Sequence, residues 1–585
     1  MPAHPRTDAG ALPDNEHIAH VFEEIADLLE LEDANPFRIR AYRNAARSVR
    51  GAEAQLTAQI RAGKPLPKLP GIGADLTEKI RTISLTGRCP LLELLHGEVP
   101  AGQIELLQLP HIGPRRVHQL HRELGVDSLA ALQEALRSGR LAHLHGFGPR
   151  LLDQLDKALR IRSARERRHL QIDAKAQAEA LLNFIHGLEG VEQVRVAGSL
   201  RRRRDTVGDL DFVVCTQGNT QQLMNALLAY PLVAEVMASG ATRSSLRLGS
   251  GMQVDVRIVG RESFGSALLY LTGSKAHSIA LRRRARTLGC KLNEYGVFRG
   301  AEQLAGETEE GTYQALGLPW IAPELREDNG EIAAAEGNLL PVLIETADLC
   351  GDLHCHTRAG YGRNSLREMA LAAQRLGWEY LAITDHSQRL SIGHGLDAGR
   401  LARQLDEIDR LNDELDSLTL LKGCEVDILP DGKLDLHDSI LARLDIVVGA
   451  VNSNLQLSAK QQTRRILRAM DSAYFTILAH PSGRLLLERE ACALDMHAVI
   501  RHARQRGCFL ELNAQPQRLD LDEYHCRLAK DEGVLLSISS DAHRLVDFAL
   551  LDFGIGQARR GWLERADVLN TRSLTQLREL LRRSR

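Results

Sequence analysis

The sequence lacks a long apolar run, a paired-cysteine motif and a strong net charge, and each absence excludes a class of protein. Its apolar stretches fall short of the ~20 residues that a membrane helix needs, so we expect no membrane partner. Its nine cysteines include no CxxC pair, which is typical of free thiols in a reducing cytoplasm. With 44% hydrophobic residues and a net charge of −2, the composition is that of an ordinary globular protein.

The length of 585 residues predicts at least three domains, and charge is distributed unevenly among them. Residues 1–326 carry 42 Lys and Arg against 37 Asp and Glu, whereas the remainder carries 32 against 39. The basic excess in the first part gives modest support for a polyanionic partner, although charge alone does not establish one.

Three similar glycine phrases recur in the first 150 residues, and a segment of helical pattern follows each of them. They are Leu69-Pro-Gly-Ile-Gly73, Leu109-Pro-His-Ile-Gly113 and Leu144-His-Gly-Phe-Gly148, followed by 74–80, 114–124 and 149–159. A glycine turn at a helix start directs backbone N–H groups outward, where they can bind a phosphate. A plain turn between packed helices would explain one copy. Three copies favour helix–hairpin–helix units that bind the DNA backbone around Gly71, Gly73, Gly113 and Gly148.

From about residue 190 the pattern changes to short apolar strands separated by helical stretches. We expect strands at 194–197, 210–215 and 254–259, and a connector at 327–348. Further strands are expected near 381–384, 419–424, 446–450, 475–479, 509–513 and 534–538. Their alternation with helices predicts parallel βαβ units or a barrel.

The stretch from Gly198-Ser199 through four arginines to Asp209-Leu-Asp211 carries the clearest chemistry. Side chains alternate along a strand, so Asp209 and Asp211 project from one face. Asp255 lies between two valines, where a carboxylate needs a metal or a partner. Three carboxylates can hold two Mg²⁺ or Mn²⁺ ions for nucleotidyl transfer, with the arginines adding positive charge. The alternative is a surface Asp-x-Asp beside an ordinary basic loop. The combination with the Gly-Ser pair, the arginines and Asp255 makes this alternative less favourable.

Two further motifs narrow this pattern to a family. Tyr270-Leu-Thr-Gly273-Ser274 and Leu292-Asn-Glu-Tyr-Gly-Val-Phe298 resemble motifs of family X DNA polymerases, and residues 312–320 resemble the bacterial branch. The resemblance extends over almost the whole chain. It implies a template-directed polymerase that fills short gaps during repair, uses dNTPs and works at the nucleoid in the bacterial cytoplasm.

The resemblance also implies roles for individual residues. Asp209, Asp211 and Asp255 match the catalytic carboxylates that bind the metal ions. Positions that contact the incoming nucleotide are matched by Gly198, Ser199, Arg202, Tyr270 and Gly273. Among these, Tyr270 matches the residue that crowds the sugar 2′ position, and Leu271 and Ser278 replace a Phe and an Asn that are common in the family.

Residues 35–50 and 69–80 resemble the small domain with which family members bind the 5′ phosphate of gapped or nicked DNA. Lys79 falls at the position of a lysine that forms a Schiff base with an abasic sugar. Such an amine must be neutral when it attacks. Asp75 stands where a supporting lysine is common, and a solvated lysine that pairs with phosphate is the alternative reading.

In the last part of the chain, potential metal ligands repeatedly follow apolar strands. They occur in Asp352-Leu-His354-Cys-His356, Asp385-His386, Glu425-Val-Asp427, His480 and Asp541-Ala-His543. A single histidine would more often be structural, but five such groups predict ligands on one rim of a barrel. Mixed His and carboxylate ligands suit Zn²⁺ or Mn²⁺.

These groups resemble the PHP domain, a distorted (β/α)7 barrel that serves bacterial family X enzymes as a metal-dependent 3′→5′ exonuclease. The resemblance implies one complete metal position, formed by His354, His356, Glu425 and Asp541.

Two further metal positions depart from the family pattern. One has Glu425 and His480, with Asn452 in place of a histidine, and the other has His386 and His543, with Tyr361 in place of an aspartate. Neither replacement has the charge or basicity of the usual ligand, so we expect a weakened exonuclease.

The expected architecture is multidomain, with helical helix–hairpin–helix modules, an α/β nucleotidyltransferase palm and a C-terminal PHP barrel. The expected boundaries are 1–85 for a DNA-binding, lyase-like domain, 86–168 for fingers, 169–262 for the palm, 263–326 for the thumb, 327–348 for a linker and 349–585 for the metal domain. Three other functions stay open: a PHP-dependent nuclease, a non-catalytic scaffold that binds DNA ends, and a template-independent transferase. The sequence identifies no protein partner.

Overall fold

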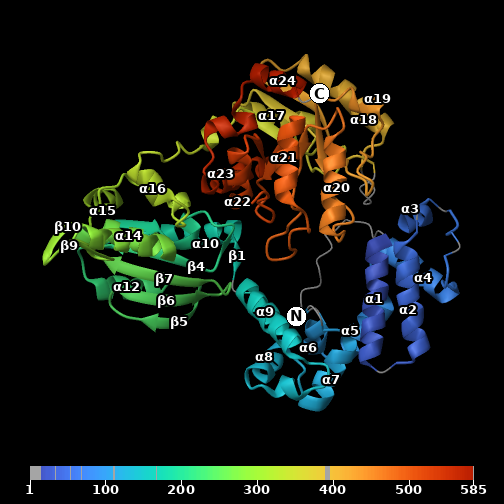
Figure 1. The fold of residues 1–585 in the computed structure, drawn as a ribbon, viewed down its shortest axis with the longest axis horizontal. Helices are drawn as coiled ribbons and strands as arrows, with labels where there is room; N and C mark the ends of the chain where they lie inside the picture. Colours follow the sequence, from blue (N-terminus) through green and yellow to red (C-terminus); the bar gives the residue numbers. More distant parts are fainter. Residues whose placement is uncertain are drawn as a thin grey trace. The chain divides into compact units, whose positions relative to one another are not determined.

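The computed structural model describes residues 15–583, except 33, 53–54, 63, 68, 108, 110–111, 167 and 389–394. Two compact units divide the chain after Glu166 (Figure 1). Residues 1–14 of the expected first domain, and Pro110 and His111 of the second glycine phrase, lie outside the described residues. Within the described ranges, no helix combines the length and the apolar character needed to cross a bilayer.

The first unit is helical throughout its described part. Its helices are α1 (Asn15–Leu31), α2 (Pro36–Arg50), α3 (Leu56–Arg61), α4 (Ala74–Thr86), α5 (Pro90–Glu98), α6 (Ala101–Leu107), α7 (Pro114–Leu124), α8 (Leu129–Arg137) and α9 (Pro149–Glu166). One hydrophobic cluster extends from Ile18 in α1 to Leu159 in α9. The modules expected at 1–85 and 86–168 therefore share one continuous core.

The three glycine phrases adopt the same turn. In each copy, the N–H of the fourth residue donates to the carbonyl of the leading leucine, over 3.3 Å at Leu69, 3.2 Å at Leu109 and 3.2 Å at Leu144. Each final glycine directly precedes a helix, α4, α7 or α9. The helix–hairpin–helix prediction is confirmed for all three copies.

The palm is a five-stranded sheet with the strand order β2-β4-β7-β6-β5. Its strands are β2 (Gln193–Val196), β4 (Asp209–Cys215), β5 (Val233–Ser239), β6 (Arg243–Leu248) and β7 (Gln253–Val259). Only the pair β4 and β7 is parallel among these strands. Helices α10 (Gln171–His186), α11 (Gly198–Arg201) and α12 (Thr220–Leu228) accompany the sheet, and the short strands β1 (His169–Leu170) and β3 (Thr206–Val207) pair beside it.

The thumb follows directly from β7 and packs around its own hydrophobic cluster. It contains α13 (Phe264–Thr272), α14 (Lys275–Thr287), the small antiparallel sheet of β8 (Lys291–Asn293), β9 (Gly296–Arg299) and β10 (Glu302–Ala305), and α15 (Glu309–Ala315). The expected connector at 327–348 is a packed segment rather than a loose tether. It holds α16 (Glu331–Glu336), whose first residue is fully buried.

The C-terminal part is a sheet of seven parallel strands in sequence order. They are β11 (Gly351–Cys355), β12 (Tyr380–Ile383), β13 (Thr419–Asp427), β14 (Ile446–Ala450), β15 (Ile477–Leu478), β16 (Phe509–Asn513) and β17 (Leu536–Ser539). The surrounding helices are α17 (Leu366–Arg375), α18 (Ala398–Asn412), α19 (Asp438–Leu441), α20 (Ala459–Met470), α21 (Met496–Arg506), α22 (Glu523–Asp531), α23 (Leu551–Arg560) and α24 (Leu574–Arg583). The six expected strands and the (β/α)7 class are confirmed, and β11 is an additional strand.

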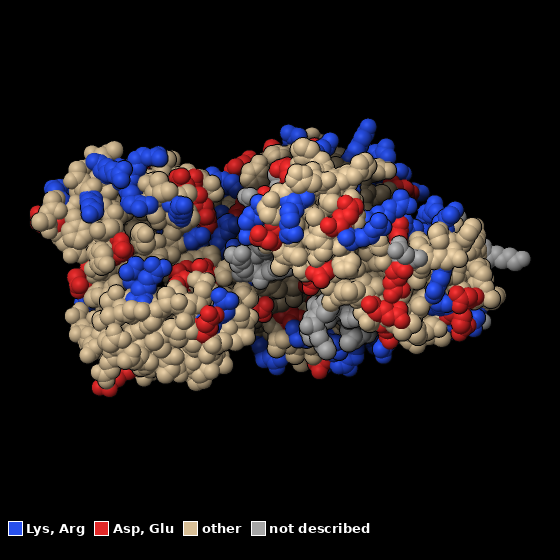
Figure 2. Space-filling model, turned by 90° about the horizontal axis from the view of Figure 1, so that it is seen from below, with Lys and Arg blue, Asp and Glu red and all other residues tan. Residues whose placement is uncertain are grey.

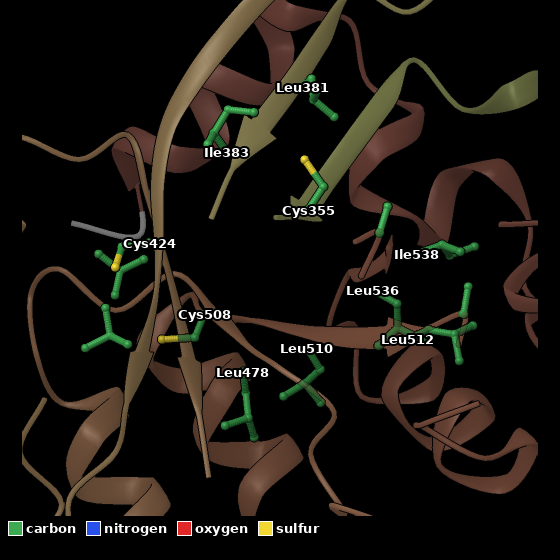
Figure 3. Packing of buried hydrophobic residues seen from close by; sticks show 14 of the residues in the cluster. Cys355, Leu381, Ile383, Cys424, Leu478, Cys508, Leu510, Leu512, Leu536 and Ile538 are labelled. Carbon is green, nitrogen blue, oxygen red and sulfur yellow. The ribbon is translucent and has the colours of Figure 1, made fainter. Parts of the chain in front are cut away.

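Alternate strand residues pack on opposite faces of the barrel wall. Leu381 and Ile383 belong to the outer cluster that packs against the helices, as do Leu510 and Leu512 (Figure 3). Tyr380 and its neighbours line the interior instead, where α24 contributes Leu577 and Leu581. Because both faces of the wall are covered, the strands are mostly apolar on both faces.

A buried asparagine closes the seam between the first and last strands. The Asn570 side chain donates to the carbonyls of Gly351 (2.9 Å) and Ile538 (2.8 Å) and accepts from the Ile538 N–H (3.0 Å). Beyond it, Cys355 forms a parallel bridge with Ala542. The side-chain amide therefore takes the place of backbone hydrogen bonds between β11 and β17, because its donor and acceptor mimic a peptide group.

Surface charge is mixed on the face drawn in Figure 2. Lys and Arg side chains form several small groups there, interspersed with Asp and Glu. Lys and Arg therefore do not form one continuous patch on that face.

Candidate active sites

The three predicted carboxylates lie on two neighbouring parallel strands of the palm. Asp209 and Asp211 share one face of β4, and the register pairs Asp211 with Asp255 of β7. Asp255 accepts hydrogen bonds from the hydroxyl of Ser245 and from the amide of Gln253 (2.9 Å). The structure thus brings together residues that are up to 46 positions apart.

Burial and neighbouring charge raise the pKa values of two of the three carboxylates, Asp211 and Asp209. Burial, together with the charges of Asp209 and Asp255, raises the pKa of Asp211 to about 7. Burial and Asp255 likewise raise the pKa of Asp209. Carboxylates crowded in this way are stabilised by a bound cation, so the donor set fits divalent ions that prefer oxygen ligands.

A glycine allows the Gly198-Ser199 turn to approach Asp211. Gly198 has a φ of +64°, and a Cβ atom there would lie 2.0 Å from Oδ2 of Asp211. The Ala197 N–H donates to the Asp211 carbonyl over 2.8 Å and fixes the turn against β4. The hydroxyl of Ser199 is buried and has no hydrogen-bond partner within the described chain. An unsatisfied buried hydroxyl fits a phosphate acceptor.

All five residues matched to nucleotide contacts line one cavity of about 330 Å³ with two of the carboxylates. The lining comprises Gly198, Ser199, Arg202, Asp209, Asp211, Tyr270, Leu271, Gly273, Lys275, Ser278 and Arg282. Lys275 and Arg282 are cations that the sequence motifs did not single out. Lys275 is the first residue of α14 and Arg282 lies about two turns further along the same helix, which begins just after the turn at Gly273.

The arginine run after Ser199 behaves differently from the expectation that it adds charge to the site. Only Arg202 of the four lines the cavity. Arg201 binds both oxygens of Glu309 over 2.7 Å, so its charge is neutralised inside the protein. Arg203 and Arg204 bind carboxylates of the C-terminal barrel.

The predicted complete metal position of the barrel is assembled as a compact set. His354 Nε2 and His356 Nε2 lie 3.2 Å apart, Glu425 Oε2 lies 3.3 Å and 3.6 Å from them, and Asp541 Oδ1 lies 3.1 Å from His356 Nε2. Ligands about 2.1 Å from a tetrahedral ion are separated by about 3.4 Å. The spacing therefore fits one Zn²⁺-sized ion, and the ligand atoms of three of the four residues, His354, His356 and Asp541, all lie within 4.8 Å of one another.

Backbone geometry and the protonation of His356 favour the same interpretation, whereas, against the effect of burial, Glu511 and Asp541 hold the pKa of His354 well above its ordinary value. Burial, with His543 and His386 nearby, lowers the pKa of His356 to about 3, so its imidazole is neutral and can offer a lone pair. His480 and Asp541 have positive φ values of 27° and 50°. Left-handed backbone at non-glycine residues costs about 1–3 kcal/mol and occurs chiefly at functional sites.

The two altered metal positions differ in what replaces the missing ligand. Asn452 donates its side-chain amide to Glu425 Oε1 over 3.1 Å, beside His480 Nε2 at 3.4 Å from the same oxygen. It therefore binds the carboxylate rather than offering an imidazole.

At the other position, the Tyr361 ring meets the His386 ring edge-on at 5.3 Å. His386 and His543 group with His356 instead, because their ring nitrogens all lie within 4.8 Å of one another. A three-histidine set can still hold a metal ion, so this position keeps a donor set despite Tyr361.

One supporting residue, Glu511, was not found from the sequence, whereas Asp352 and Asp385, named there among the potential ligands, act as hydrogen-bond acceptors instead. Glu511 accepts from His354 Nδ1 over 2.6 Å and directs Nε2 towards the metal position. Asp352 accepts from the Ser540 N–H, and Asp385 accepts from the Thr357 N–H and from Gln404. Glu511 lies in the middle of β16, and the available signal was a carboxylate between two leucines of an otherwise apolar strand.

The predicted lysine of the first unit is paired with an acid. Lys79 Nζ lies 2.5 Å from Asp75 Oδ1. Burial on its own would lower the pKa of Lys79, but Asp75 and Tyr42 outweigh it and hold the pKa above its ordinary value. This environment favours the charged amine over the neutral one that a Schiff base requires.

Three segments of the chain match models of known protein families. Family models match for a helix-hairpin-helix domain (residues 13–89), a SAM-like helix-hairpin-helix tandem (residues 104–160) and the DNA polymerase beta thumb (residues 267–327). The DNA polymerase/3′-5′ exonuclease PolX of Bacillus subtilis (strain 168) is 37% identical over 576 residues, which cover 97% of this chain and 99% of PolX.

Smaller relatives match part of the chain. A probable phosphatase of Thermoanaerobacter sp. (strain X514) is 27% identical over 232 residues, or 38% of this chain and 89% of the relative. A probable phosphatase of Caldicellulosiruptor saccharolyticus is 29% identical over 210 residues, or 34% of this chain and 83% of the relative. With its palm, its beta-type thumb, its seven-stranded barrel and its near full-length similarity to PolX, the chain belongs to the bacterial family X DNA polymerases with a C-terminal PHP domain.

Proposed function

We propose that this chain is a template-directed DNA polymerase that fills short gaps in DNA repair, using dNTPs and divalent metal ions at the bacterial nucleoid. The observation that carries the proposal is the cavity in which Asp209, Asp211, Ser199, Arg202 and Tyr270 lie together. The name of the similar protein PolX, a DNA polymerase and 3′-5′ exonuclease, supports it.

In this mechanism, Asp209, Asp211 and Asp255 hold Mg²⁺ or Mn²⁺. When bound, such ions lower the pKa of a primer 3′-hydroxyl and neutralise the triphosphate. The hydroxyl of Ser199 donates to a phosphate oxygen, since no protein group in the described chain accepts from it. Arg202, whose guanidinium also pairs with Glu327 over 3.0 Å, lines the same cavity.

The end of α13 and the turn after it are proposed to discriminate between deoxyribose and ribose. Tyr270 lies in the last turn of that helix and lines the cavity, while Gly273 ends it with a φ of +67°. A side chain at Tyr270 fills the space that a ribose 2′-hydroxyl would occupy, and this disfavours ribonucleotides.

The helix–hairpin–helix turns are proposed to hold the DNA backbone. A Cβ atom added to Gly73, Gly113 or Gly148 would meet nothing within 4 Å, so packing inside the chain does not require glycine at these positions. Close approach of a phosphate to the backbone N–H groups would require it. Lys79 is proposed to bind the 5′ phosphate of gapped or nicked DNA, and its Schiff-base role is a secondary possibility that Asp75 opposes.

For the barrel we propose a weakened 3′→5′ exonuclease that uses Zn²⁺ or Mn²⁺. His354, His356, Glu425 and Asp541 would hold one ion, and the sets around His480 and around His386 and His543 would hold further ions less firmly. Asn452 and Tyr361 are the reason, because neither supplies the basic ligand of its relatives' sites.

The test uses a duplex with a one-nucleotide gap and a 5′ phosphate, in Mg²⁺ and in Mn²⁺. Wild type should add only the complementary dNTP, and Asp209→Ala should abolish addition. Glu235→Ala, which removes an exposed acid from the same sheet, is the matched control and should retain it. Addition that ignores the templating base, or that survives Asp209→Ala, would overturn the proposal. Without dNTPs, primer shortening that depends on His354 tests the exonuclease.

A further inference from the structure

The arginine loop, residues 201–205, is held from two sides. On the thumb side, Arg201 binds Glu309 and the hydroxyl of Thr272. On the other side, the loop contacts the C-terminal barrel through side chains from three separate segments. Because this loop joins the Gly198-Ser199 turn to β4, whatever fixes it also fixes one wall of the nucleotide cavity.

The contacts with the barrel are close and specific. Arg203 donates to the carbonyl of Asp552 over 3.0 Å and forms an ion pair of 3.0 Å with its carboxylate. A Cβ atom on Gly556 would lie 2.5 Å from the Arg203 side chain, so α23 offers a glycine where the loop approaches. Arg484, four residues after His480, reaches Asp205 at 3.4 Å.

Arg203 also has a backbone conformation that needs support. Its φ is +54°, in the left-handed region that residues with a Cβ atom seldom adopt. Such a conformation persists only where its surroundings determine it, and here the surroundings are residues of the barrel.

Arg560 is the central link between the barrel and the loop. Arg560 is buried, with 5% of the residue exposed. Its Nη1 donates to the carbonyl of Arg202 over 2.9 Å and to Glu327 over 3.0 Å. Its Nη2 donates to Glu523 over 2.7 Å, and Glu523 also accepts from Arg204. The buried guanidinium of Arg560 on α23 therefore connects α22 of the barrel with Glu327, at the end of the thumb, and with the arginine loop.

Arg202 is thereby held twice. Arg560 holds its backbone carbonyl, and Glu327, which Arg560 also binds, holds its guanidinium over 3.0 Å. Although burial alone would raise the pKa of Glu327, Arg202 and Arg560 hold it below its ordinary value, so Glu327 stays charged and bridges both arginines. Arg202 is the member of the arginine loop that lines the nucleotide cavity.

We propose that Arg560 of the PHP barrel is a positioning residue for the polymerase: through Glu327 and the Arg202 carbonyl it sets Arg202 in place for the incoming dNTP. The inference rests on the proposed function of the palm. It gives the barrel a role in nucleotide binding that is independent of its own metal ligands, because no atom of His354, Glu425 or Asp541 takes part.

The test replaces Arg560 by Lys in the full chain. Lysine keeps the charge, but a single ammonium cannot serve three acceptors that lie in the fork of a guanidinium. The matched control is Arg559→Lys. Arg559 is the neighbouring arginine on α23 and binds Glu324 over 2.7 Å and the Ile344 carbonyl over 3.1 Å, without touching the arginine loop.

Two measurements are made on gapped DNA: kcat and KM for the dNTP, and equilibrium binding of the dNTP by titration. We expect Arg560→Lys to raise KM and the dissociation constant about tenfold, equivalent to about 1.4 kcal/mol, with kcat changed about threefold or less. Arg559→Lys should change each by less than about twofold. Melting curves establish that both variants fold, and Glu327→Gln serves as a second variant should Arg560→Lys fail to fold.

A double variant tests whether the effect of Arg560 on dNTP binding passes through Arg202. In an Arg202→Ala background, Arg560→Lys should weaken dNTP binding by less than about twofold further, because its effect passes through Arg202. The proposal is overturned if Arg560→Lys leaves KM and binding unchanged, if Arg559→Lys has an equal effect, or if the Arg202 and Arg560 effects add. Should wild type fail to extend any template, the proposed polymerase is wrong, and the binding titration still decides whether Arg560 positions Arg202.

Discussion

Gly198 and Asp211 are so close that a single methyl group cannot fit between them: a Cβ atom on Gly198 would lie 2.0 Å from Oδ2 of Asp211. The hydrogen bond from Ala197 to the Asp211 carbonyl holds the turn against the strand, so neither side can retreat cheaply. The position of the central carboxylate therefore depends on the absence of a side chain.

Gly198→Ala should lower kcat for gap filling by about 100-fold, because displacement of a reacting group by about 1 Å is worth that factor. Steady-state extension of a gapped duplex measures it. Gly251→Ala is the control, since Gly251 has a similarly positive φ of +87° but open space around its Cβ position. It should cost some stability and leave kcat intact. Equal loss in both variants would mean that backbone strain, not contact with Asp211, limits activity.

Ser199→Ala should raise KM for the dNTP by at least about tenfold without lowering the melting temperature. Its hydroxyl is buried and unsatisfied in the described structure, so its removal breaks no internal hydrogen bond. The lost partner is a phosphate, and hydrogen bonds to charged groups contribute about 1.5–3 kcal/mol. Thermal unfolding and dNTP titrations of the same preparation test both statements. A drop in melting temperature with unchanged KM would assign the hydroxyl to the fold.

Glu309→Gln should destabilise the palm–thumb junction. Glu309 is 5% exposed and binds Arg201 and the fully buried Arg326, both in bidentate fashion. Removing one partner of a buried ion pair costs about 3–5 kcal/mol. The melting temperature should therefore fall, whereas Glu310→Gln, at an exposed neighbouring position, should leave it unchanged.

The same residue predicts a dependence on pH. Although burial opposes it, Arg201 and Arg326 lower the pKa of Glu309 to about 2 from an ordinary value of 4.5. Its stabilising contribution is thus complete above about pH 4.5 and is lost as the pH falls towards 2. The difference in melting temperature between wild type and Glu309→Gln should be constant from about pH 8 to 5 and shrink below 4.5. A difference that shrinks on the alkaline side would contradict this assignment.

Restoring two metal ligands should strengthen the exonuclease. The double variant Tyr361→Asp with Asn452→His supplies a carboxylate beside His386 and an imidazole beside Glu425, the ligands that the family resemblance implies. We expect more bound metal per chain by elemental analysis, and primer shortening in Mn²⁺ faster by about tenfold or more. Tyr524→Asp, at an exposed tyrosine on α22, controls for added charge. Unchanged metal content would show that these two positions do not limit the site.

Asp75→Asn should release the amine of Lys79. Removal of the carboxylate that accepts from Lys79 lowers its pKa, and each unit of pKa gives about tenfold more neutral amine near pH 7. Borohydride trapping on an abasic 5′ end should therefore be slow in wild type and faster in Asp75→Asn. Glu78→Gln on the same helix is the control. Trapping that stays equal in all three proteins would leave Lys79 with phosphate binding alone.

The sequence predicted those parts of the molecule in which one local pattern determines the outcome. The alternation of side chains placed Asp209 and Asp211 on one face, and the glycine phrases predicted three turns with the same hydrogen bond. Apolar strands that end in polar residues predicted the rim of the barrel, because carboxyl ends of parallel strands meet at one edge.

Pairings between distant segments could not be predicted in that way. Asp255 reaches Asp211 only because the hairpin of β5 and β6 places β7 beside β4 in parallel, and no spacing in the sequence encodes that neighbour. The expectation that all four arginines of the run at 201–204 add charge to the nucleotide site was wrong for the same reason. Composition suggests phosphate binding, whereas Arg203 and Arg204 find Asp552 and Glu523 more than 300 residues away.

The dependence of the first part of the molecule on its last part has a genetic consequence. Arg560 supports the nucleotide cavity, and Asn570 supplies the hydrogen bonds that β11 and β17 lack at their shared edge. A nonsense or frameshift mutation just upstream of Arg560 leaves every catalytic aspartate intact, yet it removes both supports. Alleles of this kind should behave as nulls for gap filling, and screens that score only lesions in the palm would overlook them.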